Sequence, residues 1–257
     1  MEVIVPTLVS LLASLLTLFS GFGLGMLLLP AFTLFFPVEI AVMMTAVVHF
    51  ANNLFKLSLL GKFADKEVVL KFGLPAIVAS FLGANVLSTL STLPPVLTYQ
   101  VFGTNAEVSV VKLTLAILMI VFALLEFQES EDRFAFDRKY LLLGGALSGF
   151  FGGLSGHQGA LRTMFLLRCN LEKKTFLASG ILIACMIDIS RLLVYQHHLA
   201  WAALSENVLT LVSCILFAFL GAFLGARLVE KVTMRGVQRT VATMLILIAL
   251  LLGLGVI

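Results

Sequence analysis

The sequence contains few charged residues. Only 12% of its 257 residues are Asp, Glu, Lys or Arg, whereas 60% are hydrophobic and the mean hydropathy is +1.10. A soluble domain carries about 25% charged residues, so this chain has too few charges to cover a surface that faces water. The composition excludes a soluble globular domain, a disordered chain and a nucleic-acid-binding protein. It indicates a polytopic membrane protein, with room for on the order of eight apolar segments.

The chain also lacks the residue patterns of an enzyme or a cofactor site. Its three cysteines, Cys169, Cys185 and Cys214, form no CxxC pair and lie in or beside apolar segments. That placement is typical of small buried residues and not of a disulfide framework or a zinc site. No G-x-S-x-G, HExxH, Walker or dinucleotide-binding motif is present. We therefore expect no enzymatic activity, no cofactor and no metal.

Two of the apolar runs are interrupted by glycine. The runs span 3–36, 40–60, 72–93, 110–127, 140–168, 175–196, 207–228 and 238–257. Six have the length of one membrane span, but 3–36 and 140–168 are too long for one helix and short for two. Glycine disfavours helix and permits positive φ, so these two runs are expected to contain broken helices. The predicted break glycines are Gly21, Gly23 and Gly25 in the first run, and Gly153, Gly156 and Gly159 in the second.

Such breaks have two interpretations. Interrupted hydrophobic segments at corresponding positions of two halves indicate a transporter binding site. The alternative is close packing between helices through small residues.

The distribution of Lys and Arg favours a hairpin topology. If all eight runs crossed the membrane, the thirteen loop cations would divide into six on one side and seven on the other. If 140–168 is instead a re-entrant hairpin, all thirteen fall on one side, and the loops 94–108 and 197–205 carry none. The positive-inside rule selects the second arrangement. It places loops 61–71, 128–139, 168–174 and 227–239 in the cytoplasm and loops 94–108 and 197–205 outside. By analogy 3–36 is a hairpin that enters from outside, and the alternative is a full span followed by a half-helix, because 3–20 is long enough to span.

The two halves match weakly. At an offset of 135 residues, Asn53-Leu54-Phe55-Lys56 aligns with Asp188-Ile189-Ser190-Arg191, and at an offset of 142 Gly83-Ala84 aligns with Gly225-Ala226. Chance similarity between apolar segments is the alternative. The match predicts an all-α polytopic membrane protein of two inverted repeats, each with a glycine-broken or re-entrant segment and three transmembrane helices. The repeats are 1–128 and 140–257, joined by a cytoplasmic linker at 129–139.

Polar side chains inside the apolar runs are the candidate functional residues, because an intramembrane charge costs several kcal/mol and is functional by default. On 40–60, the spacing of three and four puts His49, Asn52, Asn53 and Lys56 on one face. On 175–196, Asp188 and Arg191 lie three apart, so Asp188 is either a counter-ion or a proton-coupling carboxylate. His49 is assigned the same two roles.

The second break contributes the other candidates, Ser155, His157, Gln158 and Arg162. A half-helix that begins near Gly159 would present free N–H groups and a positive dipole end to an anion. Arg162 could add bidentate hydrogen bonds to an oxyanion. Near mid-membrane the apolar runs contain three cations, Lys56, Arg162 and Arg191, but only one acid, Asp188. This excess of positive charge predicts an anionic substrate.

Three segments, SGFGLGMLLLP, GGLSGHQGALRTMFLL and ACMIDISRLLVY, resemble the TauE/SafE sulfite exporter family, also called TSUP. The resemblance covers nearly the whole chain. It implies a carrier in the bacterial inner membrane for sulfite, thiosulfate or small organosulfonates such as sulfoacetate. The first glycine run is thinner than the family's usual pattern, and the family name selects no single substrate.

The expected function is therefore secondary transport of a small anion by alternating access, in the direction of export. An anion-selective channel and a carrier of small carboxylates are the alternatives. The expected partners are the small anionic substrate and the lipid bilayer, with no nucleic acid. The sequence leaves the oligomeric state open, and a homodimer is one arrangement that it allows.

Overall fold

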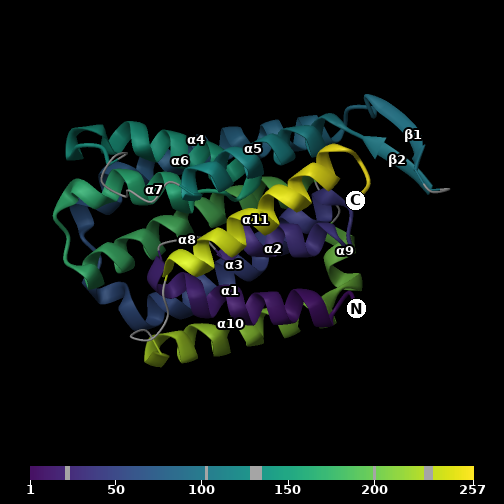
Figure 1. Cartoon of the computed structure of the whole chain (residues 1–257). Coiled ribbons are helices and arrows are strands. Elements are labelled where there is room, and N and C mark those ends of the chain that lie inside the picture. The colour runs from purple at the N-terminus through teal and green to yellow at the C-terminus, as the bar shows by residue number, and fades with distance from the viewer. Residues whose placement is uncertain (21–23, 102–103, 128–134, 199–200, 229–233) are drawn as a thin grey trace.

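The protein is a bundle of apolar helices with one small hairpin of strands (Figure 1). The computed structural model describes residues 1–20, 24–101, 104–127, 135–198, 201–228 and 234–257. The first half contains α1 (Ile4–Ser20), α2 (Leu24–Thr33), α3 (Val38–Leu60), η1 (Gly61–Phe63), α4 (Lys66–Ser91), β1 (Leu97–Val101), β2 (Thr104–Val108) and α5 (Val110–Phe127). The second half contains η3 (Arg138–Tyr140), α6 (Leu141–Ser155), α7 (Gly159–Leu166), η4 (Leu167–Cys169), α8 (Lys173–His198), α9 (Trp201–Glu206), α10 (Val208–Leu228) and α11 (Met234–Gly253).

The helices have the length and composition of membrane spans. Among the described residues, four helices are long and apolar enough to cross a bilayer: Val38–Phe63, Lys66–Ser91, Lys173–His197 and Val208–Gly225. A 26-residue helix such as α4 is about 39 Å long at 1.5 Å per residue, which exceeds the hydrocarbon core of about 30 Å. Further apolar helices are shorter. The prediction of a polytopic, mostly helical membrane protein is confirmed.

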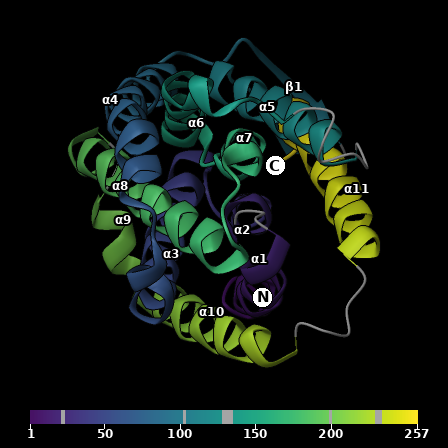
Figure 2. The ribbon, with the colours of Figure 1, turned by 90° about the vertical axis from the view of Figure 1, so that its left-hand side faces the viewer.

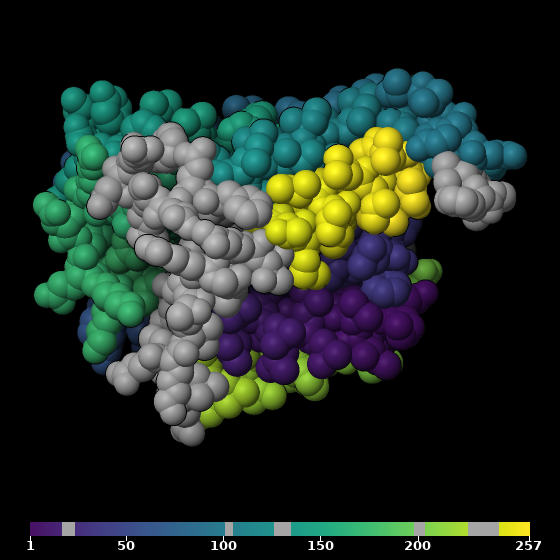
Figure 3. Space-filling model, in the orientation of Figure 1, coloured from purple at the N-terminus to yellow at the C-terminus, as the bar shows by residue number. Residues whose placement is uncertain are grey.

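The all-α prediction is wrong at the β1–β2 hairpin. The two strands pair antiparallel from Leu97 opposite Val108 to Val101 opposite Thr104. Valine, threonine and tyrosine in this segment favour extended backbone. The Tyr99 hydroxyl donates to the Leu254 carbonyl (2.6 Å), and the Glu107 amide donates to the Gly255 carbonyl (3.1 Å). These bonds tie the hairpin to the C-terminus, at the end of the bundle from which it projects (Figure 3).

The second interrupted segment is a helix, a break and a second helix whose two ends meet. α6 ends at Ser155, Gly156 takes a left-handed conformation (φ 81°), and α7 begins at Gly159. The chain before α6 contacts the end of α7: the Phe136 amide donates to the Met164 carbonyl (3.0 Å) and the Phe136 ring stacks on Phe165. The segment therefore leaves from and returns to the same end of the bundle.

The first interrupted segment has a similar shape. α1 and α2 pack against each other, and both the start of α1 and the connection from α2 to α3 lie at the right-hand end of Figure 1. The predicted break glycines Gly21 and Gly23 lie outside the described residues, whereas Gly25 is the second residue of α2.

Two of the four basic loops, 61–71 and 168–174, lie together with the described part of a third, 135–139, at the left-hand end of Figure 1. Arg138 forms an ion pair with Glu67 (2.8 Å), and Lys174 lies over the ring of Phe63. α10 ends and α11 begins at this same end, although residues 229–233 lie outside the described part. The β hairpin and both chain termini lie at the opposite end. The charged loops are therefore sorted by end, as the hairpin topology predicts.

Glycine mediates close packing between the two halves. α6 packs along α4, and α1 packs along α10. A Cβ atom on any of three α6 glycines spaced four apart would overlap a carbonyl oxygen of α4: Gly145 meets Phe72, Gly149 meets Ala76 and Gly153 meets Ser80. The prediction that Gly153 breaks the helix is therefore wrong, because it lies inside α6 and permits helix contact. At this position the small-residue interpretation holds.

α2 and α7 occupy the middle of the bundle. Viewed along the bundle axis, they lie between α3 and α8 on one side and α5 and α11 on the other (Figure 2). α2 also packs on α3 and α11, while α7 contacts α5 and α8. The two short helices of the interrupted segments therefore meet at the centre, between the spans that carry the candidate polar residues.

Candidate functional site

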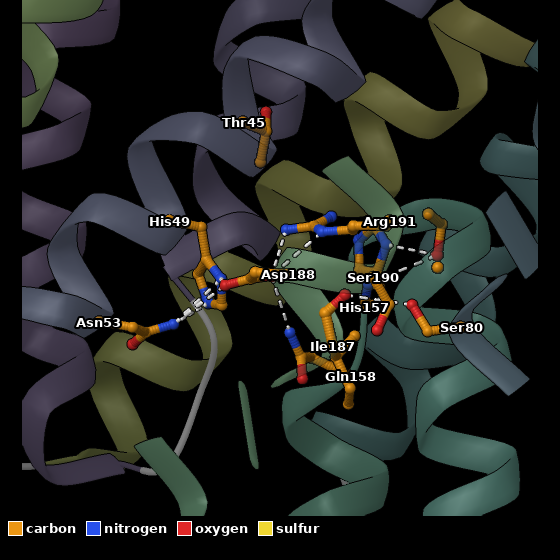
Figure 4. A network of polar contacts seen from close by, with 12 residues as sticks. Thr45, His49, Asn53, Ser80, His157, Gln158, Ile187, Asp188, Ser190 and Arg191 are labelled. Atoms are coloured by element: carbon orange, nitrogen blue, oxygen red, sulfur yellow. Dashed lines mark hydrogen bonds and ion pairs between the residues drawn. The ribbon is translucent and has the colours of Figure 1, made fainter. Parts of the chain in front are cut away.

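A buried polar cluster joins α3, α8 and the second break, and Asp188 is at its centre (Figure 4). One carboxylate oxygen of Asp188 lies 2.6 Å from Nδ1 of His49 and 3.4 Å from Nδ2 of Asn53. The other lies 3.3 Å from Nε2 of Gln158, and 3.1 and 2.8 Å from Nε and Nη2 of Arg191. Asp188 and Arg191 are fully buried. The carboxylate thus holds together side chains from both halves of the chain.

The predicted pair of Asp188 and Arg191 is present, but it is only part of the network. Asp188 accepts from four side chains, so both oxygens have donors. A buried charge is tolerated when it is paired and hydrogen-bonded, and removing one partner of such a pair costs about 3–5 kcal/mol. This environment suits a carboxylate that remains ionised.

Two other cations of the cluster have neutral partners. Nη1 of Arg162 donates to the amide oxygen of Gln158 (3.2 Å). Nζ of Lys56 lies 3.1 Å from the amide oxygen of Asn52, when that amide is oriented so that its nitrogen donates to Ser14 and to the Ala218 carbonyl. Within the described residues, neither cation forms an ion pair with a carboxylate.

Lys56 and Arg162 come from opposite halves and repel each other electrostatically. Lys56 is 5% exposed and Arg162 is 9% exposed, so water screens their charges poorly. Two buried cations that interact electrostatically and have amide oxygens as their hydrogen-bond partners make this region electropositive. An anion placed there would relieve this repulsion.

His157 lies at the break between α6 and α7. Its Nδ1 is 3.1 Å from the Ser155 hydroxyl, and its ring stacks on Phe122 with the centroids 5.5 Å apart. In the described part of the chain, Nε2 of His157 and Nη1 of Arg191 have no hydrogen-bond partner. The break therefore presents polar groups with unused hydrogen-bonding capacity.

The interrupted segments meet beside this cluster. A Cβ atom on Gly25 of α2 would lie 3.5 Å from the Gly156 carbonyl and 3.9 Å from Cδ2 of His49. A Cβ atom on Gly156 would lie 2.7 Å from Nη1 of Arg191. Gly156 thus lets the backbone approach Arg191, whereas a Cβ atom on Gly25 would make only ordinary contacts. Since α2 and α7 begin here, their free N–H groups and dipoles add positive potential to the same region.

All the sequence-predicted polar residues lie in or next to this cluster. Sequence reasoning missed Ser14, Tyr195 and Phe122. Thr7, Ser10 and Ser14 recur at spacings of three and four on α1, a pattern that marks one polar face. Ser14 bonds the amide of Asn52, and the Tyr195 hydroxyl donates to the Gly153 carbonyl. Nothing in the sequence placed Phe122 beside His157.

The described residues contain no group of three or more His, Cys, Asp or Glu side chains that could hold a metal ion. Cys169, Cys185 and Cys214 are free and buried. The polar cluster therefore consists of hydrogen-bonding and ionic groups, with more cations than anions.

Comparison with known proteins assigns the family. The family model of the sulfite exporter TauE/SafE matches residues 7–252, a range that includes the second interrupted segment, all but the first residues of the first, and every residue of the cluster. No curated protein matches the chain. The members of this family are membrane transporters and not enzymes. The chain therefore belongs to the sulfite exporter TauE/SafE family of membrane transporters.

Proposed function

We propose that the protein exports small sulfur-containing oxyanions or organosulfonates, of the sulfite, thiosulfate and sulfoacetate type, across the bacterial inner membrane by alternating access. The observation that carries this proposal is the pair of buried cations, Lys56 and Arg162, which come from opposite halves and have no carboxylate partner within the described residues. The family match supports the same class of substrate.

The charge balance of the cluster favours an anion. Lys56, Arg162 and Arg191 carry three formal positive charges and Asp188 carries one negative charge, which leaves 3 − 1 = +2 with neutral histidines. A buried cation without a partner costs several kcal/mol in a bilayer, and a bound oxyanion offsets that cost. A carrier of cations would be expected to have the reverse excess.

The packing supports two inverted repeats, 1–128 and 140–257, joined by the linker 129–139. Gly83 and Gly225 are the residues aligned at an offset of 142, and they make equivalent contacts. Gly83 of α4 packs against the α6 backbone at Phe150, and Gly225 of α10 packs against the α1 backbone at Leu15. One interrupted segment enters from each end of the bundle. This is the arrangement that underlies alternating access in many secondary transporters.

The proposed direction of transport rests on the sign of the membrane potential, which acts on the anion whichever way the protein is oriented. An inside-negative potential favours efflux of an anion by about 2.3 kcal/mol per charge per 100 mV. Export of the substrate anion then needs no coupled ion for its driving force.

A flux screen in proteoliposomes tests the proposal. Proteoliposomes that contain the purified protein are loaded with unlabelled sulfite, sulfate, thiosulfate, sulfoacetate or a small carboxylate. Counterflow, the uptake of the same anion in labelled form, is then measured. Counterflow of a sulfur oxyanion is the expected result, because a carrier exchanges its substrate. Absence of counterflow together with large single-channel currents would establish a channel, and counterflow restricted to carboxylates would contradict the proposed substrate class.

Arg162→Lys tests the site itself. Lysine keeps the charge but lacks the planar guanidinium, so we expect affinity for the anion to fall on the order of tenfold, equivalent to about 1.4 kcal/mol. Arg138→Lys is the matched control, because Arg138 is an exposed residue paired with Glu67. If Arg162→Ala and Lys56→Ala both fold and bind with wild-type affinity, the anion site is elsewhere.

A further inference from the structure

We propose that His49 is a proton-binding site that takes up a proton when the anion binds, with Asp188 as its fixed counter-ion. The proposal rests on the proposed function, since the anion concerned is the transported one. In this proposal His49 of the first half couples proton binding to anion binding, and Asp188 of the second half is its counter-ion.

The contact between α3 and α8 sets the tautomer of His49. Asp188 accepts from Asn53, Gln158 and Arg191, which suits an ionised carboxylate that can only accept. Nδ1 of His49, 2.6 Å from Asp188, must then carry the hydrogen. The lone pair of the neutral ring is therefore on Nε2, which lies 3.4 Å from the Asn53 amide nitrogen; the same nitrogen lies 3.1 Å from Nδ1.

The position of His49 places this lone pair beside the interrupted segments. Cδ2, the ring atom bonded to Nε2, faces Gly25 at the start of α2, and Gly25 in turn lies against the Gly156 carbonyl. His49 is 3% exposed. A proton on Nε2 would thus add its charge at the place where both breaks and the cations of the cluster converge.

Charged and titratable groups surround His49 from several elements. α8 contributes Asp188 and Arg191, and α7 contributes Arg162. The Cys185 thiol of α8 interacts with Asp188 and Arg162. Lys56 lies further along α3 itself, and α10, which packs on α3, carries Cys214. α2 contains no titratable side chain. Asp188 attracts a proton to the ring, while Arg191 and Arg162 repel it. Without an anion, a proton on His49 would add a positive charge to a cluster that already has an excess.

A bound anion reverses this balance. Its negative charge offsets the repulsion from the arginines, so anion binding favours protonation of His49, and by reciprocity protonation favours anion binding. In the step itself, a proton from water adds to the Nε2 lone pair and forms imidazolium, while the hydrogen bond from Nδ1 to Asp188 is kept. The proton returns to water when the anion leaves, so one proton crosses with each anion. A dianion such as thiosulfate then still carries one net negative charge, so the inside-negative potential continues to drive its export, while an acidic exterior opposes it.

Calorimetry on the purified wild-type protein gives the first test. Thiosulfate is the probe, because sulfite exchanges protons itself near neutral pH; sulfoacetate replaces it if the flux screen excludes thiosulfate. Binding is measured in two buffers with different ionisation enthalpies, which gives the number of protons taken up. We expect up to one proton per anion for the wild type and none for His49→Gln. His197→Gln, at an exposed histidine far along α8, is the control and should match the wild type.

Transport gives the second test. In liposomes with the membrane potential clamped, a gradient of one pH unit supports about a tenfold accumulation per coupled proton. Wild-type protein should accumulate labelled thiosulfate in the alkaline compartment. His49→Gln should lose this accumulation, while exchange of labelled for unlabelled anion is reduced but not abolished, because the anion then binds without the favourable charge of the proton. Retained exchange also shows that the variant is folded.

The outcomes separate the two proposals. A wild-type protein that transports the anion without proton uptake overturns the role of His49 and leaves the proposed function intact, as does proton uptake that persists in His49→Gln. A protein that transports no anion refutes the proposed function. If His49→Gln does not fold, NMR of the wild-type protein with isotope-labelled histidine decides between the outcomes. The spectrum can be assigned because the chain has only four histidines. The His49 signal should shift to that of imidazolium when thiosulfate is added at constant pH, and an unchanged signal contradicts the proposal.

Discussion

Gly156→Ala should destabilise the protein and weaken anion binding together. The left-handed backbone at Gly156 (φ 81°) costs an L-residue about 1–2 kcal/mol. The new Cβ would also lie 2.7 Å from Nη1 of Arg191, which is too close, so the guanidinium must move. Its 2.8 Å ion pair with Asp188 would then lengthen. A chain of this size loses about 2–4 °C in its melting midpoint per kcal/mol, so we expect a decrease of about 2–8 °C.

Gly25→Ala is the matched control, because Gly25 faces Gly156 across the junction of the two breaks. Its Cβ would make ordinary contacts at 3.5 Å and beyond, and it lies inside α2, where alanine is favoured over glycine by up to about 1 kcal/mol. Its melting midpoint should therefore equal or exceed the wild type. Thermal unfolding in detergent and thiosulfate affinity are measured for both variants. A Gly156→Ala protein as stable as the wild type, or a larger loss in Gly25→Ala, would refute the reasoning.

Three further predictions follow from the packing and the topology. Asp188→Asn removes the buried counter-ion of Arg191 and should cost about 3–5 kcal/mol, seen as a lower melting midpoint; an unchanged midpoint would show that the network tolerates a neutral centre. Gly149→Ala places a methyl group against the α4 backbone and should cost about 1–3 kcal/mol, whereas a neutral effect would mean that α4 and α6 separate easily. Single cysteines at 170–173 should react with an impermeant reagent only from the cytoplasmic side, and labelling in intact cells would contradict the hairpin topology.

The sequence predicted the polar face of α3 correctly because a period of three and four residues is visible without knowing any partner. The same holds for the second break, where clustered glycine and polar residues mark the end of α6. The contact between His49 and Asp188 could not be predicted, since they lie 139 residues apart and periodicity gives only the face of a helix. The partner of Lys56 could not be predicted either: it is the Asn52 amide oxygen, from the same helix.

Two misses have a common physical origin. Glycine in an apolar run both breaks helices and lets helices approach, and only the packing partner decides between these roles. Gly153 lies against Ser80 of α4 and is helical, whereas Gly156 has positive φ and ends the helix. In the same way, the residues of the β1–β2 hairpin favour extended backbone, but their pairing depends on anchoring by the C-terminus.

The packing of α6 on α4 and of α1 on α10 has a consequence for how such a carrier can move. In each half the long helix of the interrupted segment, α1 or α6, packs closely through glycine against a helix of the other half, α10 or α4. Because of these two contacts, the halves cannot move as separate rigid bodies unless α4 separates from α6 and α1 separates from α10. The mobile units must be composite, with α4 and α6 moving together and α1 and α10 moving together. α8 packs on α4, α3 packs on α10, and α3 and α8 pack on each other, so the contact of His49 with Asp188 joins the two units.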